Sequence, residues 1–396
     1  MRYTIGQLAE IIDGDRGKNY PKQDEFYPQG YCLFLNTGNV TKEGLIFEEN
    51  QFIMKEKDEA LRKGKLKRGD IVYTTRGTVG NAGYYNSSVP YENVRINSGM
   101  VILRSNGEIV DARFLYQILK SEYYRPYFKQ YCTGSAQPQL PIKNFSQIYL
   151  NVPDIKTQHR IADILSVYDN LIENNQRQIK LLEEVAQRLY KEWFVDLNFP
   201  GHENTKIVDG VPEGWNEKTL SQVADVIMGQ SPKSEFYNSE KKGLPFHQGV
   251  GSYGVRFVMD DIYSTSYTRI AEPNSILFSV RAPVGRLNIT KNKVVIGRGL
   301  AAINQADGCQ SYLYYLLKNR FFKDNIVGNG SIFASVSKDE LLNQKFLMPE
   351  RNLMMQFEKI VSQMDKQIEN LDSKNKKLIE ARDRLLPKLM SGEVEV

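Results

Sequence analysis

The side chains best placed for chemistry in this sequence are polar and basic residues in loops. Arg76 and Arg281 each end a stretch that is typical of a strand, and each precedes a turn that contains glycine. A guanidinium group at such a position can reach a phosphate or a guanine base. An internal salt bridge that holds the loop is the alternative. Both roles are binding roles and require no covalent chemistry.

The sequence shows no set of residues that is typical of an enzyme. It has no glycine-rich methyl-donor loop after a strand, no Asn-Pro-Pro-aromatic segment and no Walker A loop. The histidines His159, His202 and His247 lack acidic partners at metal-binding spacing. The three cysteines form no Cys-x-x-Cys pair, which predicts buried, reduced thiols. We therefore expect a chain without catalytic residues, bound metal or cofactor.

Length and composition favour a protein of several parts. The chain has 396 residues, more than one ordinary domain, and its 41% hydrophobic content allows sizeable cores. Its net charge of +5 permits a polyanionic partner without proving one. Neither an apolar run long enough for a membrane span nor a signal peptide is present. We expect a cytoplasmic protein with no membrane partner.

The chain contains the same pattern twice, as six matches in one order show. The match that includes the arginines aligns Gly69–Gly80 with Asn274–Gly285. Chance could give one such match, but hardly a full series. The other matches are Ile5–Gly14 with Leu220–Gly229, Phe114–Leu119 with Tyr312–Leu317, Gly134-Ser135 with Gly330-Ser331, Val152-Pro153 with Met348-Pro349, and Ile172–Asn174 with Ile368–Asn370.

The repeat divides the chain into globular parts and helices. Alternating stretches such as Asp70–Tyr73 and Ser275–Phe278 predict strands. The fold class expected is α+β, with two mixed α/β parts and two long helices related by a pseudo-twofold axis. The predicted bounds are a first globular part at 1–155, a central helix at 156–196, a linker at 197–212, a second globular part at 213–350, and a C-terminal helix and tail at 351–396.

Each long helix has a heptad seam, with apolar residues alternately four and three positions apart. In the first helix the seam is Ile161, Leu165, Tyr168, Ile172, Asn175, Ile179, Leu182, Ala186, Leu189 and Trp193. In the second it is Phe357, Val361, Met364, Ile368, Leu371, Asn375, Leu378, Arg382, Leu385 and Leu389. Arg382 interrupts the second seam, and Ala381 is the alternative for that layer. Pro387 is expected to kink or end the helix.

Antiparallel pairing with Asn175 opposite Asn375 brings the remaining seam residues together. A buried asparagine pair costs stability but fixes the register, which predicts an intramolecular antiparallel coiled coil. The alternative places both asparagines on a solvated face. A seam of this length spans about 50 Å. The layers predicted are Ile172 with Leu378, Ile179 with Leu371, Leu182 with Ile368, Ala186 with Met364, Leu189 with Val361, and Leu165 with Leu385.

Several segments together indicate a family. They are the Arg76–Gly80 turn, Ile172–Asn175 leading to Leu189–Phe194 in the central helix, Val211–Trp215 at the start of the second copy, and Leu385–Gly392 near the C-terminus. With these segments, the chain resembles the specificity subunit of type I restriction–modification systems over essentially its whole length. One departure is Ala282, which replaces the first glycine of the turn, so the second loop is expected to differ in shape.

The resemblance implies a function and partners. In that family the globular parts are target recognition domains, and each reads one half of a bipartite, asymmetric DNA site. The helices set the unread spacer and dock two modification (methyltransferase) subunits that methylate adenine, and restriction subunits join the complex. S-adenosylmethionine, ATP and Mg would then belong to the partner subunits. Two recognition domains about 50 Å apart would lie roughly one to one and a half turns of double-stranded DNA apart.

The resemblance also directs attention to corresponding loops as DNA contacts. Backbone amides and a lysine after Gly14 and Gly229 suit phosphate, whereas asparagine and glutamine amides suit adenine. Turn residues are often Asn, Gly and Ser for conformational reasons alone, which is the alternative for each. The basic run 62–68 could follow phosphates or simply be solvated. The candidate DNA-binding residues are Lys18, Asn36, Thr37, Asn39, Arg76, Ser135, Gln137, Lys233, His247, Gln248, Arg281 and Ser331.

Two other functions remain open at this point. One is a DNA-targeting adaptor of another defence or restriction system, which would lack two methyltransferase partners. The other is a coiled-coil scaffold without a DNA role, which predicts no sequence preference and little salt dependence of nucleic-acid binding. The scaffold alternative leaves the divergence between corresponding loops unexplained.

Overall fold

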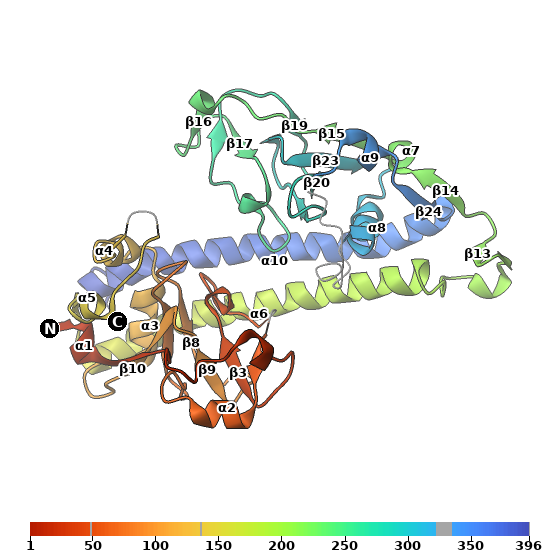
Figure 1. Cartoon of the computed structure of the whole chain (residues 1–396). Helices are drawn as coiled ribbons and strands as arrows, with labels where there is room; N and C mark the ends of the chain where they lie inside the picture. Colours follow the sequence, from red (N-terminus) through yellow and green to blue (C-terminus); the bar gives the residue numbers. More distant parts are fainter. Residues whose placement is uncertain (48–49, 135–136, 322–334, 396) are drawn as a thin grey trace. The chain divides into compact units, whose positions relative to one another are not determined.

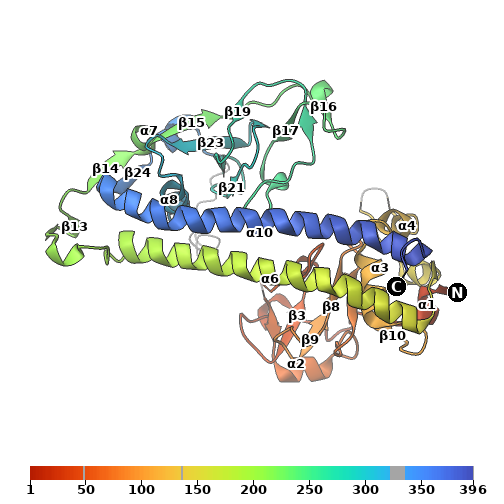
Figure 2. The ribbon, with the colours of Figure 1, turned by 180° about the vertical axis from the view of Figure 1, so that it is seen from behind.

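The computed structural model describes residues 1–47, 50–134, 137–321 and 335–395, and the chain divides into two compact units. Unit 1 comprises Met1–Gln176 and Asp372–Val396, and unit 2 comprises Arg177–Leu371. Each unit contains one globular part and about half of each long helix, as Figure 1 and Figure 2 show.

The centre of unit 1 is a four-stranded antiparallel sheet in the order β2-β10-β7-β8. Its strands have the bounds β2 Ala9–Asp13, β7 Ile71–Thr74, β8 Ala82–Tyr84 and β10 Met100–Ser105. Every residue of β7 is buried, because a core covers each face of the sheet. Ile71 and Tyr73 pack into one core and Val72 packs into the other, as the alternation of side chains along a strand requires.

The rest of unit 1 surrounds this sheet. A three-stranded sheet, β6-β3-β9, contains the parallel pair β3 and β9, while β1 pairs with β11 and β4 pairs with β5. The strand bounds are β1 Arg2–Thr4, β3 Cys32–Leu35, β4 Val40–Thr41, β5 Gly44–Leu45, β6 Phe52–Ile53, β9 Val94–Ile96 and β11 Tyr149–Asn151. The short helices are α1 Ile5–Leu8, α2 Lys55–Ala60, α3 Ala112–Lys120, α4 Arg125–Lys129 and α5 Ile142–Ser146, with 3₁₀ turns at Gln23–Glu25 and Thr37–Asn39.

Unit 2 repeats the topology of the central sheet of unit 1. Its four-stranded sheet has the order β15-β23-β20-β21, and β14 pairs with β24 as β1 pairs with β11. Asp13 lies opposite Val101 in unit 1, and Met228 lies opposite Ala301 in unit 2, so the register is also the same. The bounds are β14 Asn216–Thr219, α7 Leu220–Val223, β15 Ala224–Met228, β20 Ile276–Ser279, β21 Leu287–Ile289, β23 Leu300–Gln305, α8 Gln310–Phe321, α9 Lys338–Leu342 and β24 Lys345–Met348.

The units differ in the sheet beside the central one. Unit 2 has the order β16-β18-β17-β22-β19, with β17 and β22 parallel. The bounds are β16 Tyr237–Asn238, β17 Leu244–His247, β18 Tyr263–Ser264, β19 Ile270–Ala271 and β22 Val294–Ile296, with 3₁₀ turns at His202–Asn204, Ser234–Phe236 and Val250–Ser252. The hairpin of β12 Ile207–Val208 and β13 Val211–Pro212 precedes the second globular part.

The long helices are α6, Ile155–Phe194, and α10, Arg351–Ser391. Their halves run in opposite directions within each unit. In unit 1, Leu165 shares a core with Leu386 and Leu389, and in unit 2, Ala186 shares a core with Val361. Every predicted seam residue is buried or half-buried. The α+β architecture predicted from the sequence, with two mixed parts and two long helices that pack together, is confirmed.

Two details of α10 differ from the expectation. Ala381 is exposed, so the suggestion that it fills the layer at Arg382 was wrong. Arg382 itself is only 9% exposed and donates to the carboxylate of Asp169 on α6 at 2.8 Å. The ion pair explains how a charged residue occupies an apolar seam. The helix also continues beyond Pro387 to Ser391, so the proline does not end it.

The two seam asparagines meet in unit 1. The side-chain nitrogen of Asn175 donates to the side-chain oxygen of Asn375 at 2.8 Å, and Asn375 is only 7% exposed. The structure therefore brings together the two amides on which the predicted register depends, and it does not leave them on a solvated face.

A double-mutant cycle tests whether this pair contributes as a unit. Asn175→Leu alone should lower the free energy of unfolding by about 1–3 kcal/mol, because the buried amide of Asn375 loses its partner. The double variant Asn175→Leu, Asn375→Leu should recover that loss, since two apolar side chains replace two polar ones. Denaturant unfolding of the full chain measures both. Equal, additive losses from the two substitutions would contradict a coupled pair.

Candidate nucleic-acid interface

The turns that follow Arg76 and Arg281 have the same backbone frame. In unit 1 the hydroxyl of Thr74 donates to the carbonyl oxygen of Thr78 at 2.5 Å and accepts from the N–H of Asn81 at 2.9 Å. In unit 2 the hydroxyl of Ser279 makes the two corresponding bonds, at 2.6 Å and 2.8 Å. The hydroxyl of the last strand residue, two positions before the arginine, therefore closes each turn.

The replacement of Gly77 by Ala282 changes only the middle of the turn. Gly77 has a φ of +69°, a conformation that favours glycine, whereas Ala282 has no positive φ and its peptide bond to Pro283 is cis. The ends of the turns still match, because Gly80 and Gly285 each donate to the strand-terminal residue at 3.0 Å. The expected difference in shape is thus local.

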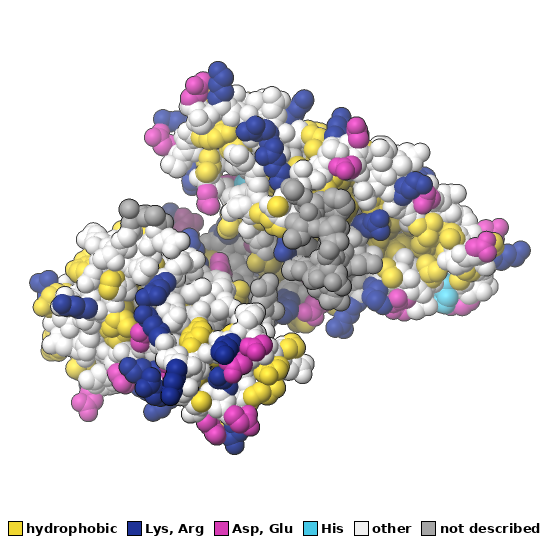
Figure 3. Space-filling model, viewed as in Figure 1, with side chains coloured by type: hydrophobic (Ala, Val, Ile, Leu, Met, Phe, Trp, Pro, Cys, Tyr) yellow, Lys and Arg dark blue, Asp and Glu magenta, His cyan; other side chains and the backbone are white. Residues whose placement is uncertain are grey.

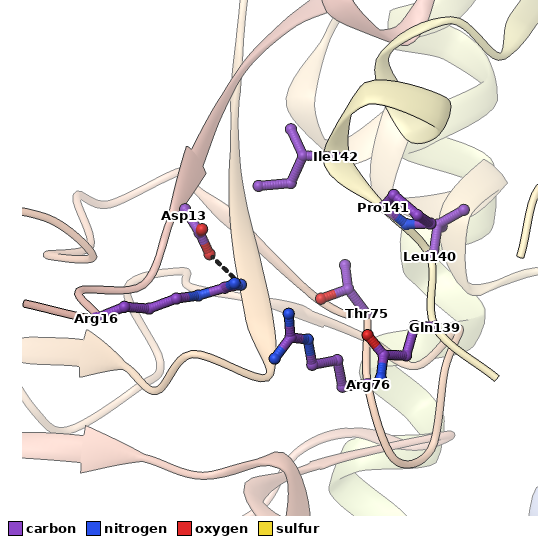
Figure 4. Close-up of a pocket in the computed structure, with 8 residues that line it drawn as sticks. All are labelled: Asp13, Arg16, Thr75, Arg76, Gln139, Leu140, Pro141 and Ile142. Carbon is purple, nitrogen blue, oxygen red and sulfur yellow. Dashed lines mark hydrogen bonds and ion pairs between the residues drawn. The ribbon is translucent and has the colours of Figure 1, made fainter. Parts of the chain in front are cut away.

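Arg76 lines a pocket at the edge of unit 1. The pocket lies where β2 and β7 end and is closed by the segment before α5, which is attached by a 2.9 Å bond from the N–H of Leu140 to the carbonyl of Thr75. In Figure 4 the guanidinium groups of Arg16 and Arg76 point toward the same hollow. The lining residues are Asp13, Arg16, Thr75, Arg76, Gln139, Leu140, Pro141 and Ile142.

Unit 2 has the same frame around Arg281. The N–H of Val336 donates to the carbonyl of Val280 at 2.8 Å, as Leu140 does to Thr75 in unit 1. Arg281 is exposed, as is Arg76. No acidic partner of either arginine is found among the described residues, so the internal salt bridge considered for them gains no support.

The lysines predicted to hold phosphate are at the surface. Lys18 and Lys233 are both exposed in the loops that follow β2 and β15. Asp15, in the same loop as Lys18, has a structural role instead, since its carboxylate accepts from the N–H groups of Gly17 and Arg62, each at 2.8 Å. The bond to Gly17 contributes most to lowering the pKa of Asp15.

The amides of Asn36 and Gln248 stand at corresponding positions. Leu35 is aligned with Ile96 and His247 with Ile296, and the residue directly after each strand bears the amide. Asn36 is half-buried and accepts from the N–H of Gly38 at 2.7 Å, whereas Gln248 is exposed. Both remain candidates for base contacts.

The neighbours of these amides are less accessible. Asn39 is 3% exposed, and its side chain bonds to the backbone of Asn36 and Ile46. Thr37 is half-buried. His247 is 1% exposed, with one ring nitrogen 2.8 Å from Ser252 and the other 3.1 Å from Asp260. The structure therefore gives Asn39 and His247 conformational roles and does not present them to a ligand.

The remaining loop candidates are only partly described. Gln137 is exposed in the segment before the pocket residue Gln139. Ser135 and Ser331 lie outside the described residues, as does Gly330, the residue matched to Gly134.

The basic run 62–68 is partly committed to internal contacts. Lys65 donates to Asp58 at 2.5 Å, and Arg68 bonds to the backbone carbonyls of Asn86 and Val89. Only the other basic side chains of the run are candidates for an external ligand. On the face shown in Figure 3, Lys and Arg side chains form several groups interspersed with acidic ones, so charge alone does not mark one interface.

A buried charged group anchors each globular part to its helices. In unit 1, Asp169 of α6 accepts from Lys120 of α3 and from Arg382, both at 2.8 Å. Burial alone would raise the pKa of Asp169, but the two cations outweigh it and the pKa is lowered. The globular part is therefore bonded to both helices through one carboxylate.

In unit 2, Arg256 occupies the centre of the corresponding group. It is 2% exposed, donates to Glu183 of α6 at 3.2 Å and to Asp365 of α10, and lies over the ring of Tyr314 at 4.2 Å. Burial raises the pKa of Asp365 despite this arginine. Sequence reasoning missed Arg256 because no local pattern marks it.

The remaining features concern potential metal ligands, the cysteines and membrane-spanning helices. No group of three or more potential metal ligands occurs within the described residues. The cysteines are free, and burial raises the pKa of Cys32 to about 12 and that of Cys309 to about 11, so both stay thiols. Cys132 is only half-buried, unlike the expectation. In the part of the chain described, helices that combine the length and the apolar character of a membrane span are absent.

Comparisons with known proteins agree over nearly the whole chain. The model of the type I restriction modification DNA specificity domain matches residues 1–184 and 212–381. The putative type I restriction enzyme MjaX specificity subunit of Methanocaldococcus jannaschii is 29% identical, with 100% of this chain and 94% of that protein covered. The HindI specificity subunit of Haemophilus influenzae is 24% identical, with 98% and 100% covered.

A solved structure shares the fold. The S subunit of a type I restriction–modification system from M. genitalium has a TM-score of 0.53 at 18% identity, with 98% of this chain and 95% of that chain covered.

Proposed function

Because this chain belongs to the family of type I restriction modification DNA specificity domains, we propose that it recognises one bipartite, asymmetric DNA sequence and directs its partner subunits to it. One observation supports two different half-sites in particular. The hydroxyl bond that closes the turn and the arginine within it occur in both units, while side chains around them differ, as Asn36 and Gln248 do. A constant frame with variable side chains suits two readers of different sequences.

The partners we propose are two adenine-methylating subunits and the restriction subunits, in the cytoplasm. S-adenosylmethionine, ATP and Mg would be bound by these partners. Exposed apolar side chains on α6 support docking of other proteins, because large apolar patches on the surface of a protein commonly mark interaction sites. They are Ile164, Val167 and Leu171 in unit 1, and Leu181 and Val185 in unit 2.

The helices are proposed to set the spacer between the half-sites. Both α6 and α10 pass without interruption from one unit to the other. Packed α-helices resist bending, so their length would fix how far apart the half-sites lie. The proposal also includes the boundaries that the sequence predicts for the two globular parts, the two helices and the linker.

Mapping methylated adenines tests the proposed function directly. In cells that contain this chain and its partner subunits, methylation should occur within one two-part sequence with a constant spacer. Removing the gene for this chain should abolish that methylation while the partner subunits remain. An unchanged methylation pattern would overturn the proposal.

The arginine turns give a residue-level prediction. Arg76→Ala should weaken DNA binding by about 1–3 kcal/mol and reduce protection of one half-site, and Arg281→Ala should do the same at the other. Footprinting and salt titration of the assembled complex measure both effects. Lys55→Ala, which removes an exposed positive charge on α2, is the matched control. Unchanged affinity and salt dependence in both arginine variants would show that the sites are assigned wrongly.

A further inference from the structure

Each unit has a second arginine near Arg76 or Arg281, but the two units carry it at positions that do not correspond. The registers of the central sheets make Arg16 correspond to Ser231, and Ser98 correspond to Arg298. Unit 1 therefore has arginine then serine at these two positions, whereas unit 2 has serine then arginine.

These two positions touch each other in both units. In unit 1 the guanidinium of Arg16 donates to the backbone carbonyl oxygen of Ser98 at 3.2 Å. In unit 2 the backbone N–H of Arg298 donates to the hydroxyl of Ser231, also at 3.2 Å. The guanidinium group of Arg16 thus contacts the backbone of Ser98, the residue that corresponds to Arg298 in unit 2. The two positions are hydrogen-bonded in both units, but the arginine occupies the first position in unit 1 and the second position in unit 2.

The second arginine lies next to the first in the backbone frame. The carbonyl of Gly99 accepts from the N–H of Arg76 at 3.1 Å, and the carbonyl of Gly299 accepts from the N–H of Val280, which precedes Arg281, at 2.9 Å. In unit 1, Arg16 and Arg76 line one pocket with the hydroxyl of Thr75 and the amide of Gln139 (Figure 4).

The charges at this pocket favour an anion. Two guanidinium groups that face the same hollow repel each other unless negative charge lies between them. Asp13 forms an ion pair with Arg16 at 3.1 Å, but it is one carboxylate facing two guanidinium groups, and solvent reaches both partners of the pair. Met228 replaces Asp13 in unit 2, so no carboxylate stands at the corresponding position there.

We propose that each unit grips one phosphate of the DNA backbone between two arginines, Arg76 with Arg16 in unit 1 and Arg281 with Arg298 in unit 2. The proposal rests on the proposed function and adds that these four arginines position the DNA without reading its sequence. Arginine suits this role because its planar fork matches two phosphate oxygens. Phosphate contacts fix register and orientation while carrying no sequence information.

Moving the arginine across the contact tests the proposal. Arg16→Ser should weaken binding of the assembled complex to its DNA site about tenfold and lower the salt slope by up to about one. Adding Ser98→Arg to that variant copies the arrangement of unit 2 and should restore most of the affinity and the slope. The mirror pair is Arg298→Ser followed by Ser231→Arg. Lys55→Ser, with the same change in net charge, should leave both quantities near the wild-type values.

The outcomes separate this inference from the proposed function. If the wild-type complex has no preferred DNA sequence, the proposed function fails. If the wild type is specific but Arg16→Ser and Arg298→Ser bind as it does, only the phosphate grip fails. A changed base preference in either variant would also overturn it, because the arginine would then be reading a base. Equal thermal unfolding midpoints ensure that folding is not what changed, and a double variant that folds but stays weak counts against the proposal.

Discussion

The Arg256→Ala variant is expected to lose about 3–5 kcal/mol of unfolding free energy. Arg256 is 2% exposed and is the cation between Glu183 of α6 and Asp365 of α10. Its removal leaves two half-buried carboxylates without their shared partner. The loss also removes packing of the guanidinium on Tyr314. Denaturant unfolding of the full chain, monitored by circular dichroism, measures the change.

The structure also predicts how the free energy of unfolding changes when the same experiment is repeated at acidic pH. The pKa of Asp365 is raised by burial, so the folded state binds its proton more tightly than the unfolded state. Stability associated with this group therefore increases as the pH falls through its folded pKa. The deficit of Arg256→Ala should shrink in that range. Adding Asp365→Asn should give back part of the loss at neutral pH, whereas a deficit below about 0.5 kcal/mol would contradict the role of the arginine.

Phe357→Ala should cost about 3–5 kcal/mol, through lost transfer energy and the cavity left behind. Phe357 is fully buried where α10 begins, at the centre of an aromatic cluster in unit 2. Its ring centroid lies 5.3 Å from that of Phe194 and 6.0 Å from that of Trp193, both on the last turn of α6. The substitution removes the side chain that joins the two helices and α8.

Two controls bracket this result. Phe357→Leu keeps most of the volume, so it should cost much less than the alanine variant. Met355→Ala, two residues earlier on the same helix, should be within about 0.5 kcal/mol of the wild type because Met355 is 53% exposed. If Met355→Ala and Phe357→Ala lowered the free energy of unfolding by similar amounts, the aromatic cluster would not be what stabilises this end of α10.

The sequence alone determined the repeat and the two long helices, and it led to the hypothesis that they pack antiparallel. The repeat and the helices follow from local periodicity: a seam at heptad spacing is typically buried against another such seam, and two asparagines at matching positions exclude most registers. The corresponding arginines were also visible, because two copies in one chain act as their own comparison. Once the strand register was known, the same comparison would have shown that Arg16 and Ser98 correspond to Ser231 and Arg298.

The tertiary structure alone decided which polar residues are free to bind and which hold the fold. His247 and Asn39 match the chemistry of base contacts, yet both are buried in hydrogen bonds to their own unit. Arg382 looked like an interruption of the seam, and no sequence pattern marked Arg256, but each forms an ion pair with a half-buried carboxylate. The physical reason is that burial and pairing depend on contacts between residues tens to hundreds of positions apart, whereas periodicity records only neighbours along the chain.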